Sequence, residues 1–264
     1  MPTNRTLYLS VRIRNNPFPS VLKNINMEKQ ADKKFEVLFI EDTASLDEVK
    51  RLRGKVFFAK NEKEEDEFDE YSKHLAVIDK DTKVIVGSYR LLLASAAKRH
   101  KGFYSETEFD LTNIKNNCKG ELLEMSRACV LNSYRKYPII KFIWKEIISF
   151  VIKNNIKYIF GCPSIEQSSP EHIGEVMEFF KKNCFSEEKH RVYPVKGKEY
   201  KFNTFVNKSD LKITYRALPS LIRGYLKMGA LVCSEPAWDS HFRTVDFFMM
   251  VEVEKFSAYK AKFS

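Results

Sequence analysis

The segment PIIKFIWKEIISFVIKNNIKYIFGCPS (residues 138–164) contains a helix followed directly by a strand. Its first part carries apolar residues on a helical stripe, and Pro138 fits the first helical position because the N–H that proline lacks has no partner there. Two asparagines end this helix, and IKYIFGCPS (156–164) then shows the apolar run of a buried strand. With the preceding strand candidate GELLEMSRACV (120–130), the segment forms a strand, helix, strand unit, which predicts a parallel pair of strands.

Shorter elements flank this unit on its N-terminal side. FEVLFI (35–40) is predicted to be a strand, and Ser45 with Glu48 has the spacing of a capping box that starts a helix. HLAVID (74–79) and VIVGSYRLLLAS (84–95) surround a turn and predict an antiparallel hairpin. These elements place antiparallel strands before the parallel pair.

Helices and one more strand are predicted on the C-terminal side. The helices lie near residues 170–182 and from Pro219 to Met228, where Gly229 ends the second helix, and VDFFMMVEV (245–253) reads as a final strand. We therefore expect an α/β (α+β) fold with a mixed, mostly antiparallel central sheet that is flanked by helices and holds one parallel strand-helix-strand unit.

Composition places the chain among globular proteins with an acidic partner. It has 264 residues and a formal net charge of +10. Residues 1–34 are predicted to be a loosely ordered basic arm, and residues 35–264 a single domain. No apolar run approaches the length of a membrane-spanning helix, and the N-terminus lacks the pattern of a secretory signal, so we expect a cytoplasmic protein. The five cysteines form no CxxC pair, which favours reduced thiols without disulfides or metal.

The basic balance is compatible with nucleic acid, anionic lipid or an acidic protein. No zinc-finger spacing or RNA-binding motif occurs, so we do not expect nucleic-acid binding. The basic arm and the segment 189–216 could contact an anionic membrane peripherally, at its inner face.

Charged residues occur where the pattern predicts burial. Arg53 shares a helix face with two apolar residues and needs a carboxylate, which Asp66, Asp69 or Glu124 could supply. Arg90 lies inside an apolar strand and also needs a carboxylate partner.

Glu124 and Arg127 would point to opposite faces of an unbroken strand, whereas a bulge between them would aim both at one cleft. A structural ion network is the alternative interpretation of all these charges. Four further glutamates of the acidic run 61–71 are interpreted as solvated: Glu62, Glu64, Glu65 and Glu67.

Several fragments occur here in one order: LRGKVF, FDEYSKHL, VGSYRLL, GFYSETEFDL, LEMSR, IIKFIW, YIFGCPS, LPSLIRGYLKMGA and PAWDSHFRTVDFFMM. This series resembles the ornithine N-acyltransferases that make lyso-ornithine lipid, relatives of the acyl-homoserine-lactone synthases. The resemblance covers roughly residues 50–251 and implies a GNAT-like fold. It also implies that six residues line the reaction cleft: Arg53, Asp66, Asp69, Arg90, Glu124 and Arg127. Asp239, Phe242 and Asp246 match the terminal fragment without a role that the sequence assigns.

The resemblance implies an N-acyltransferase that moves a (hydroxy)fatty acyl group from acyl carrier protein to the α-amine of ornithine. No bound cofactor or metal is expected, and the acyl-phosphopantetheine of the carrier serves as co-substrate. The loop NSYRKYP (132–138) lacks the glycines that cradle a pyrophosphate, so Arg135 and Lys136 are expected to meet the single phosphate of phosphopantetheine instead. A strongly acidic carrier would also use the basic surface.

Direct attack of the acceptor amine on the thioester is the expected mechanism, with Glu124 as the first candidate for the general base. His74 is a second candidate, although a histidine at a strand start is more often a satisfied structural group. The two aspartates would bind the cationic acceptor and the arginines its carboxylate. The alternatives are a lactone synthase, an N-acyltransferase for another amino acid, and a noncatalytic module that binds membrane or carrier protein.

Overall fold

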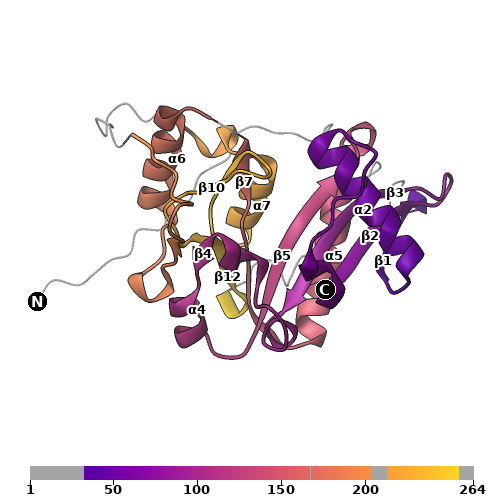
Figure 1. The fold of residues 1–264 in the computed structure, drawn as a ribbon, viewed down its shortest axis with the longest axis horizontal. Helices are drawn as coiled ribbons and strands as arrows, with labels where there is room; N and C mark the ends of the chain where they lie inside the picture. The colour runs from indigo at the N-terminus through magenta and orange to yellow at the C-terminus, as the bar shows by residue number, and fades with distance from the viewer. Residues whose placement is uncertain (1–32, 167, 204–212, 256–264) are drawn as a thin grey trace, which may run out of the picture.

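The computed structural model describes residues 33–166, 168–203 and 213–255, and its centre is a seven-stranded sheet (Figure 1). The strand order is β1-β2-β3-β5-β6-β12-β9. The strands of this sheet are β1 (Phe35–Ile40), β2 (Lys73–Asp79), β3 (Ile85–Leu93), β5 (Glu121–Val130), β6 (Ile156–Gly161), β9 (Leu231–Val232) and β12 (Met249–Glu252). β5 and β6 pair in parallel, whereas the other neighbours pair antiparallel. The predicted fold class, the hairpin and the parallel unit are confirmed.

Two small sheets lie beside the central one. One has the order β10-β11-β7 and the other pairs β4 with β8. Their strands are β4 (Phe109–Asp110), β7 (Ser164–Glu166), β8 (Tyr193–Pro194), β10 (Ala237–Asp239) and β11 (Thr244–Asp246). The α-helices are α2 (Thr43–Phe58), α3 (Ala94–Ala97), α4 (Thr112–Asn117), α5 (Ile139–Lys153), α6 (Pro170–Asn183) and α7 (Ser220–Lys227). No helix among the described residues is long and apolar enough to cross a membrane.

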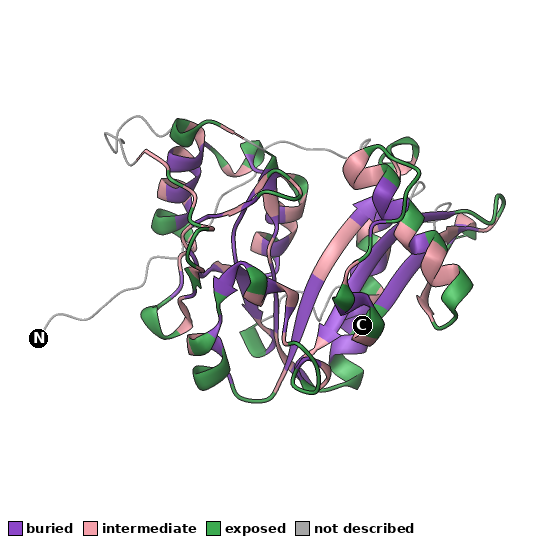
Figure 2. Cartoon of the chain, in the orientation of Figure 1, coloured by how far each residue is buried: buried purple, intermediate pink, exposed green. Residues whose placement is uncertain are grey.

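Helix α5 forms because its apolar positions recur at helical spacing, and it packs that stripe against the sheet. Ile143 and Ile147 are fully buried there, in one cluster with Leu123 of β5 and Ile159 of β6. Each such side chain contributes about 1.5–3 kcal/mol when it leaves water. Figure 2 shows the central strands buried along most of their length. This packing fixes the strand, helix, strand unit that carries the site.

Two local predictions need correction. The N-cap of α2 is Asp42, whose side chain accepts a hydrogen bond from the Ser45 N–H, so Ser45 lies inside the helix. The expected final strand is broken into β11 and β12, which belong to different sheets. Phe247 and Phe248 lie at the break and are both fully buried. The Phe247 N–H donates to the Pro163 carbonyl at 3.3 Å and the Phe248 N–H to the Ser234 hydroxyl at 2.9 Å, so neither continues a strand ladder.

β5 and β6 separate after a short parallel pairing. The register ends at Glu124 opposite Phe160, although β5 continues to Val130 alongside β3. Gly161 ends β6 so close to β5 that an added Cβ would lie 2.4 Å from the Met125 carbonyl oxygen. The edge of β5 beyond Glu124 therefore faces a gap instead of a neighbouring strand.

The predicted bulge in β5 occurs slightly further along the chain than expected. The register with β3 shifts between Ser88, opposite Cys129, and Arg90, opposite Ser126. Arg127 lies within this irregularity and has a φ of 56°, in the left-handed region that side chains with a Cβ rarely adopt. The predicted basic arm, residues 1–34, lies outside the described residues apart from its last two positions.

Candidate active site

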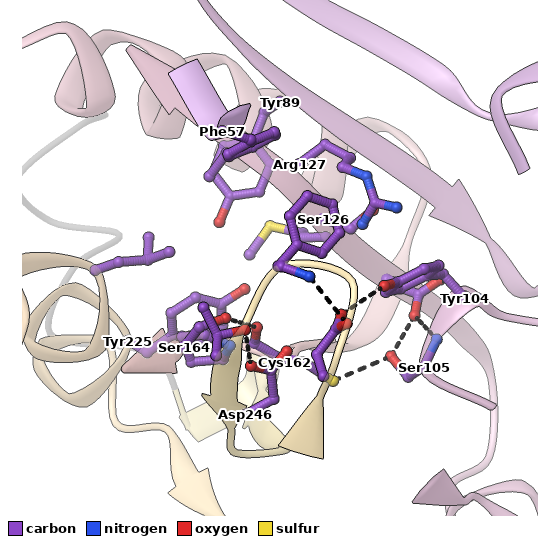
Figure 3. A pocket seen from close by; sticks show the side chains of 18 residues that line it. Phe57, Tyr89, Tyr104, Ser105, Ser126, Arg127, Cys162, Ser164, Tyr225 and Asp246 are labelled. Carbon is purple, nitrogen blue, oxygen red and sulfur yellow. Dashed lines mark hydrogen bonds between the residues drawn. The ribbon is translucent and has the colours of Figure 1, made fainter. Parts of the chain in front are cut away.

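A cavity of about 240 Å³ lies in the gap where β5 leaves β6 (Figure 3). Its walls come from β5, the loop before β4, the turn after β6, helix α7 and the β10–β11 hairpin. The charged or polar lining residues that the site uses are Tyr104, Ser105, Glu124, Arg127, Cys162, Ser164, Asp239, Thr244 and Asp246. Apolar lining comes from residues that include Phe57, Leu221 and Phe242.

Glu124 is the buried carboxylate of the β5 wall. Its Oε1 accepts hydrogen bonds from the backbone N–H of Ser105 at 2.7 Å and from the Ser105 hydroxyl, and its Oε2 accepts one from the Tyr104 N–H at 2.8 Å. Burial raises the pKa of Glu124 above its usual range, although the Ser105 hydroxyl opposes this shift. A fixed carboxylate with a raised pKa is a suitable proton acceptor near neutral pH.

Arg127 is the one arginine that lines the cavity among the described residues. Its guanidinium carbon lies 4.2 Å from the centre of the Tyr104 ring and 4.7 Å from that of Phe242. Nε donates to Glu64 at 2.8 Å and one Nη donates to Asp66 at 2.7 Å. These contacts hold the guanidinium flat between two aromatic faces, with its edge turned to carboxylates.

Arg127 belongs to a set of paired charges that extends away from the cavity. We call this set the arginine network: Arg53, Glu64, Asp66, Asp69, Arg90 and Arg127. Asp69 accepts from Arg53 at 2.7 Å and from Arg90 at 3.0 Å. Arg90 also donates through Nε to the Ser126 hydroxyl at 2.9 Å. The two guanidinium groups lower the pKa of Asp69 to about 2 against the opposing effect of burial. Three arginines and three carboxylates therefore neutralise one another.

His74 completes this network as a neutral group. Its Nδ1 lies 2.9 Å from an Arg53 Nη, and its Nε2 lies 3.0 Å from the Asp69 carbonyl oxygen. Since guanidinium only donates, Nδ1 accepts and Nε2 carries the proton. Burial, with the charge of Arg53, lowers the pKa of His74 to about 4. Its ring does not line the cavity, so the geometry agrees with the structural interpretation of His74.

The structure corrects two expectations about the charged residues. Glu64, which the sequence places among the solvated glutamates, is only 5% exposed and pairs with Arg127. Of the six residues expected to line the cleft, the cavity is lined by Glu124 and Arg127. The other four lie in the arginine network behind its wall: Arg53, Asp66, Asp69 and Arg90.

A larger groove of about 920 Å³ continues from the cavity toward the start of α5. Phe57, Leu221 and Phe242 line both spaces, so the groove and the cavity share a wall. Arg135 lines the groove, whereas Lys136 is not among its lining residues, and the Lys136 Nζ lies 5.3 Å from the Tyr137 ring centre. Of the two residues expected at the phosphate, the groove thus contains Arg135.

Sequence reasoning missed one group, which we call the acidic triad: Glu108, Asp239 and Asp246. One oxygen from each carboxylate lies within 4.8 Å of the others, and all three residues are buried. Asp239 and Asp246 line the cavity. The signal was present in GFYSETEFDL and PAWDSHFRTVDFFMM, which hold these residues. Nothing in their local patterns indicates that a loop and a hairpin more than a hundred residues apart bring them together.

Comparison with known proteins agrees with this architecture. The model of the acetyltransferase (GNAT) domain family matches residues 47–145. The chain carries a GNAT domain. The match covers most of α2, the β2–β3 hairpin, β5 and the first half of α5. Of these elements, α2, β3 and β5 carry the three arginines of the network, and β5 carries Glu124.

Two curated relatives extend the similarity over most of the chain. The L-ornithine N(alpha)-acyltransferase of Brucella abortus is 28% identical over 242 residues, covering 84% of this chain and 86% of the relative. The enzyme of that name from Rhizobium meliloti is 27% identical, covering 84% of this chain and 81% of the relative. The resemblance seen in the sequence is confirmed, and the GNAT domain is that of an acyltransferase.

One solved structure shares the fold. FeeM, an N-acyl amino acid synthase from uncultured soil microbes, superposes with a TM-score of 0.51 at 9% identity. The superposition covers 85% of this chain and 94% of FeeM. At this identity the likeness concerns the arrangement of the sheet and helices around the GNAT domain.

Proposed function

We propose that the protein transfers a (hydroxy)fatty acyl group from acyl carrier protein to the α-amine of ornithine. The observation that carries the proposal is the position of Glu124, a fixed buried carboxylate in the wall of a cavity that borders a larger groove. Such an arrangement lets a thioester arrive from one side and an amine from the other. The name shared by the relatives supports ornithine as the acceptor.

The groove supports a donor that carries a long apolar arm. Its walls include Val56, Ile139, Ile140 and Trp144, which can cover an aliphatic chain or a pantetheine arm. Arg135 lies at the same groove near the start of α5, where helix N–H groups favour an anion. These features are compatible with a single phosphate, and the formal charge of +10 is compatible with an acidic carrier protein.

Glu124 is the proposed general base for direct transfer. The neutral α-amine attacks the thioester carbonyl carbon, the new C–N bond forms, and Glu124 accepts the proton that the nitrogen loses. The C–S bond then breaks, Glu124 returns the proton to the sulfur, and the phosphopantetheine leaves as a thiol. N–H groups on the unpaired edge of β5 are the candidates for stabilising the oxyanion.

A covalent acyl-enzyme is not part of the proposal. Cys162 lines the cavity, yet burial and the nearby Glu108 raise the pKa of its thiol well above the usual range. Burial also raises the pKa of the Cys129 thiol. Both sulfurs therefore remain protonated, and a thiol is a poor nucleophile compared with a thiolate.

Incubation of the protein with 3-hydroxyacyl carrier protein and ornithine, followed by mass spectrometry, tests the proposal. We expect N-acylornithine from the natural protein and a loss of turnover of at least about 100-fold in Glu124→Gln, which keeps the side-chain shape but cannot accept the proton. Glu235→Gln is a matched control, since Glu235 forms a surface ion pair with Lys181. Lactone formation from S-adenosylmethionine, or no acylation of any amino acid, would contradict the proposal.

The product would carry one acyl chain and enter the membrane, so we also propose peripheral contact with an anionic bilayer from the cytoplasm. The surface that we favour is the basic segment 189–216, of which residues 204–212 lie outside the described part of the chain. Sedimentation with vesicles of anionic and neutral lipids, with and without added salt, tests this contact. Equal binding to both vesicle types would contradict it.

A further inference from the structure

The acidic triad differs from every other buried charge cluster among the described residues in having no cation. Both carboxylate oxygens of Glu108 are buried and have no hydrogen-bond partner, although the side chain is only 1% exposed. None of the three carboxylates forms an ion pair with a described lysine or arginine. A buried carboxylate without donors is costly, so the site as it stands is incomplete.

Protein donors satisfy part of the other two members. Asp239 Oδ1 accepts from the N–H groups of His241 at 2.7 Å and Phe242 at 3.2 Å, which fixes the hairpin turn. Asp246 Oδ1 accepts from the Thr244 hydroxyl at 2.7 Å. These bonds engage the Oδ1 atom of each aspartate and orient the two side chains. The Tyr104 hydroxyl, 3.3 Å from Asp239 Oδ2, and the Ser164 hydroxyl beside Asp246 are further donors nearby.

Electrostatics supports a ligand with positive charge. Burial, together with the charges of Asp246 and Asp239, raises the pKa of Glu108 well above its usual range. Burial and the charge of Asp239 raise the pKa of Asp246 to about 7, although the hydroxyls of Thr244 and Ser164 oppose this effect. Lys198 and Arg127 act on the cluster from a distance without pairing with it. A bound cation would offset both the burial and the mutual repulsion that raise these pKa values.

Three carboxylate oxygens that lie close together can accept hydrogen bonds from one ammonium group. An R–NH₃⁺ group offers three N–H donors in a tripod, and acceptors about 2.9 Å from its nitrogen lie roughly 4.6 to 4.8 Å apart. The triad supplies three acceptors within 4.8 Å of one another. Calcium would require six to eight oxygen ligands, whereas here several oxygens are already occupied by backbone and hydroxyl donors.

We propose that the acidic triad binds the side-chain ammonium group of a diamino acid acceptor while its α-amine is presented to Glu124. Asp239 and Asp246 line the same cavity as Glu124 and Arg127, and Glu108, which is not itself a lining residue, has an oxygen within 4.8 Å of theirs. Figure 3 shows Asp246 and Arg127 in this cavity. One small molecule can therefore contact the two aspartates and Glu124. The inference rests on the proposed function and adds the origin of its acceptor selectivity. The terminal amine of ornithine would thus be the recognised group and the α-amine the reacting group.

Comparison of L-ornithine with L-norvaline, which has the same carbon chain but no terminal amine, tests the subsite. We expect the natural protein to acylate ornithine with a kcat/KM about 100-fold above that for norvaline, the effect of losing a charged hydrogen-bonded contact. Glu108→Gln should reduce this ratio toward one, mainly by raising KM for ornithine. Glu235→Gln, on the segment that leads into β10, should retain the ratio.

Direct binding separates failure of the subsite from failure of the proposed function. Calorimetric titration of the full chain with ornithine and norvaline should show a preference for ornithine that Glu108→Gln abolishes, even where no acyl transfer is detected. Equal use of both acceptors by the natural protein would overturn the subsite but leave N-acylation intact. Stoichiometric binding of calcium or magnesium that Glu108→Gln abolishes would overturn the ammonium assignment in favour of a metal site.

Discussion

The arginine network reaches the cavity through Arg127 and the acidic triad through Asp239 and Asp246, and both are buried clusters of charge. The network matches three arginines with three carboxylates, so its formal charge is zero. The triad has three carboxylates and no paired cation among the described residues. Some network atoms also lack partners, such as Arg53 Nε and Glu64 Oε2. Each of those groups is nevertheless bonded through its other atoms, whereas Glu108 is bonded through neither oxygen.

The difference in charge balance indicates that the arginine network has a structural role and that the acidic triad has a role in ligand binding. A neutral, hydrogen-bonded cluster can be buried permanently and used to hold α2, β3, β5 and the acidic run in place. An unbalanced cluster is unfavourable until a ligand supplies the opposite charge, which is what a binding site requires. The network therefore positions the Glu124 wall, and the triad receives the acceptor.

The largest expected effect comes from removing the charge at the centre of the network. Asp69→Asn should lower the free energy of unfolding by about 3–5 kcal/mol, because Arg53 and Arg90 would remain buried without their shared carboxylate. Chemical denaturation measures the change. Glu65→Gln is the control, since Glu65 pairs with Lys50 at the surface, and its effect should stay below about 1 kcal/mol. Similar losses in both variants would show that the network is not the stabilising unit.

Acidification should weaken the network through His74. Its pKa falls from an ordinary 6.5 to about 4 in the folded protein, so the unfolded chain binds the proton more readily. Stability from this group is present above pH 6.5 and is lost as the pH falls toward 4. Between pH 7 and pH 5 the natural protein should lose about 2 kcal/mol relative to His74→Gln.

The comparison with His74→Gln isolates this effect. Asp246, whose pKa is raised to about 7, titrates in the same range with the opposite sign, because its folded form binds the proton more readily. That contribution is common to both proteins and cancels in the difference. Parallel stability curves for the two proteins would show that His74 is not held neutral by the network.

The smallest expected effect comes from the triad and has the opposite direction. Without a ligand, Glu108→Gln should leave the free energy of unfolding unchanged or raise it by about 1 kcal/mol near pH 8, because it removes repulsion among buried carboxylates. Addition of ornithine should then stabilise the natural protein more than the variant, as thermal melting can measure. A destabilised variant would assign Glu108 to the scaffold and remove the contrast between the two clusters.

Local patterns predicted much of the fold because their causes are local. The stripe of α5 and the apolar run of β6 require only the period of the side chains, and both elements occur where expected. The prediction of one continuous final strand was wrong. Phe247 packs against Phe180 and Phe248 against Phe160, and the spacing of apolar residues does not reveal these two different partners. The N-cap of α2 was displaced by three residues because Asp42 and Ser45 are both good capping residues.

For the charged residues of the site, too, the sequence predicted burial but not the partners. A buried arginine was predictable from Arg53 and Arg90, since each lies on an otherwise apolar face. The carboxylates that pair with these arginines were not predictable from the sequence. Glu64 was wrongly predicted to be solvated because a run of acidic residues usually is, whereas it pairs with Arg127. Hydrogen bonds and ion pairs between distant segments depend on tertiary packing, which sequence spacing does not encode.

From its sequence alone, this protein is determined to have a mixed α/β fold with buried arginines and a parallel strand-helix-strand unit, because periodicity and residue type act over a few neighbours. The acyltransferase activity was implied by the resemblance to a known family. Only the tertiary structure decided that Glu124 and Arg127 share a cavity and that Arg53, Asp69 and Arg90 stand behind it. It also brought Glu108 beside Asp239 and Asp246, since the balance of buried charge is a property of segments that meet in space.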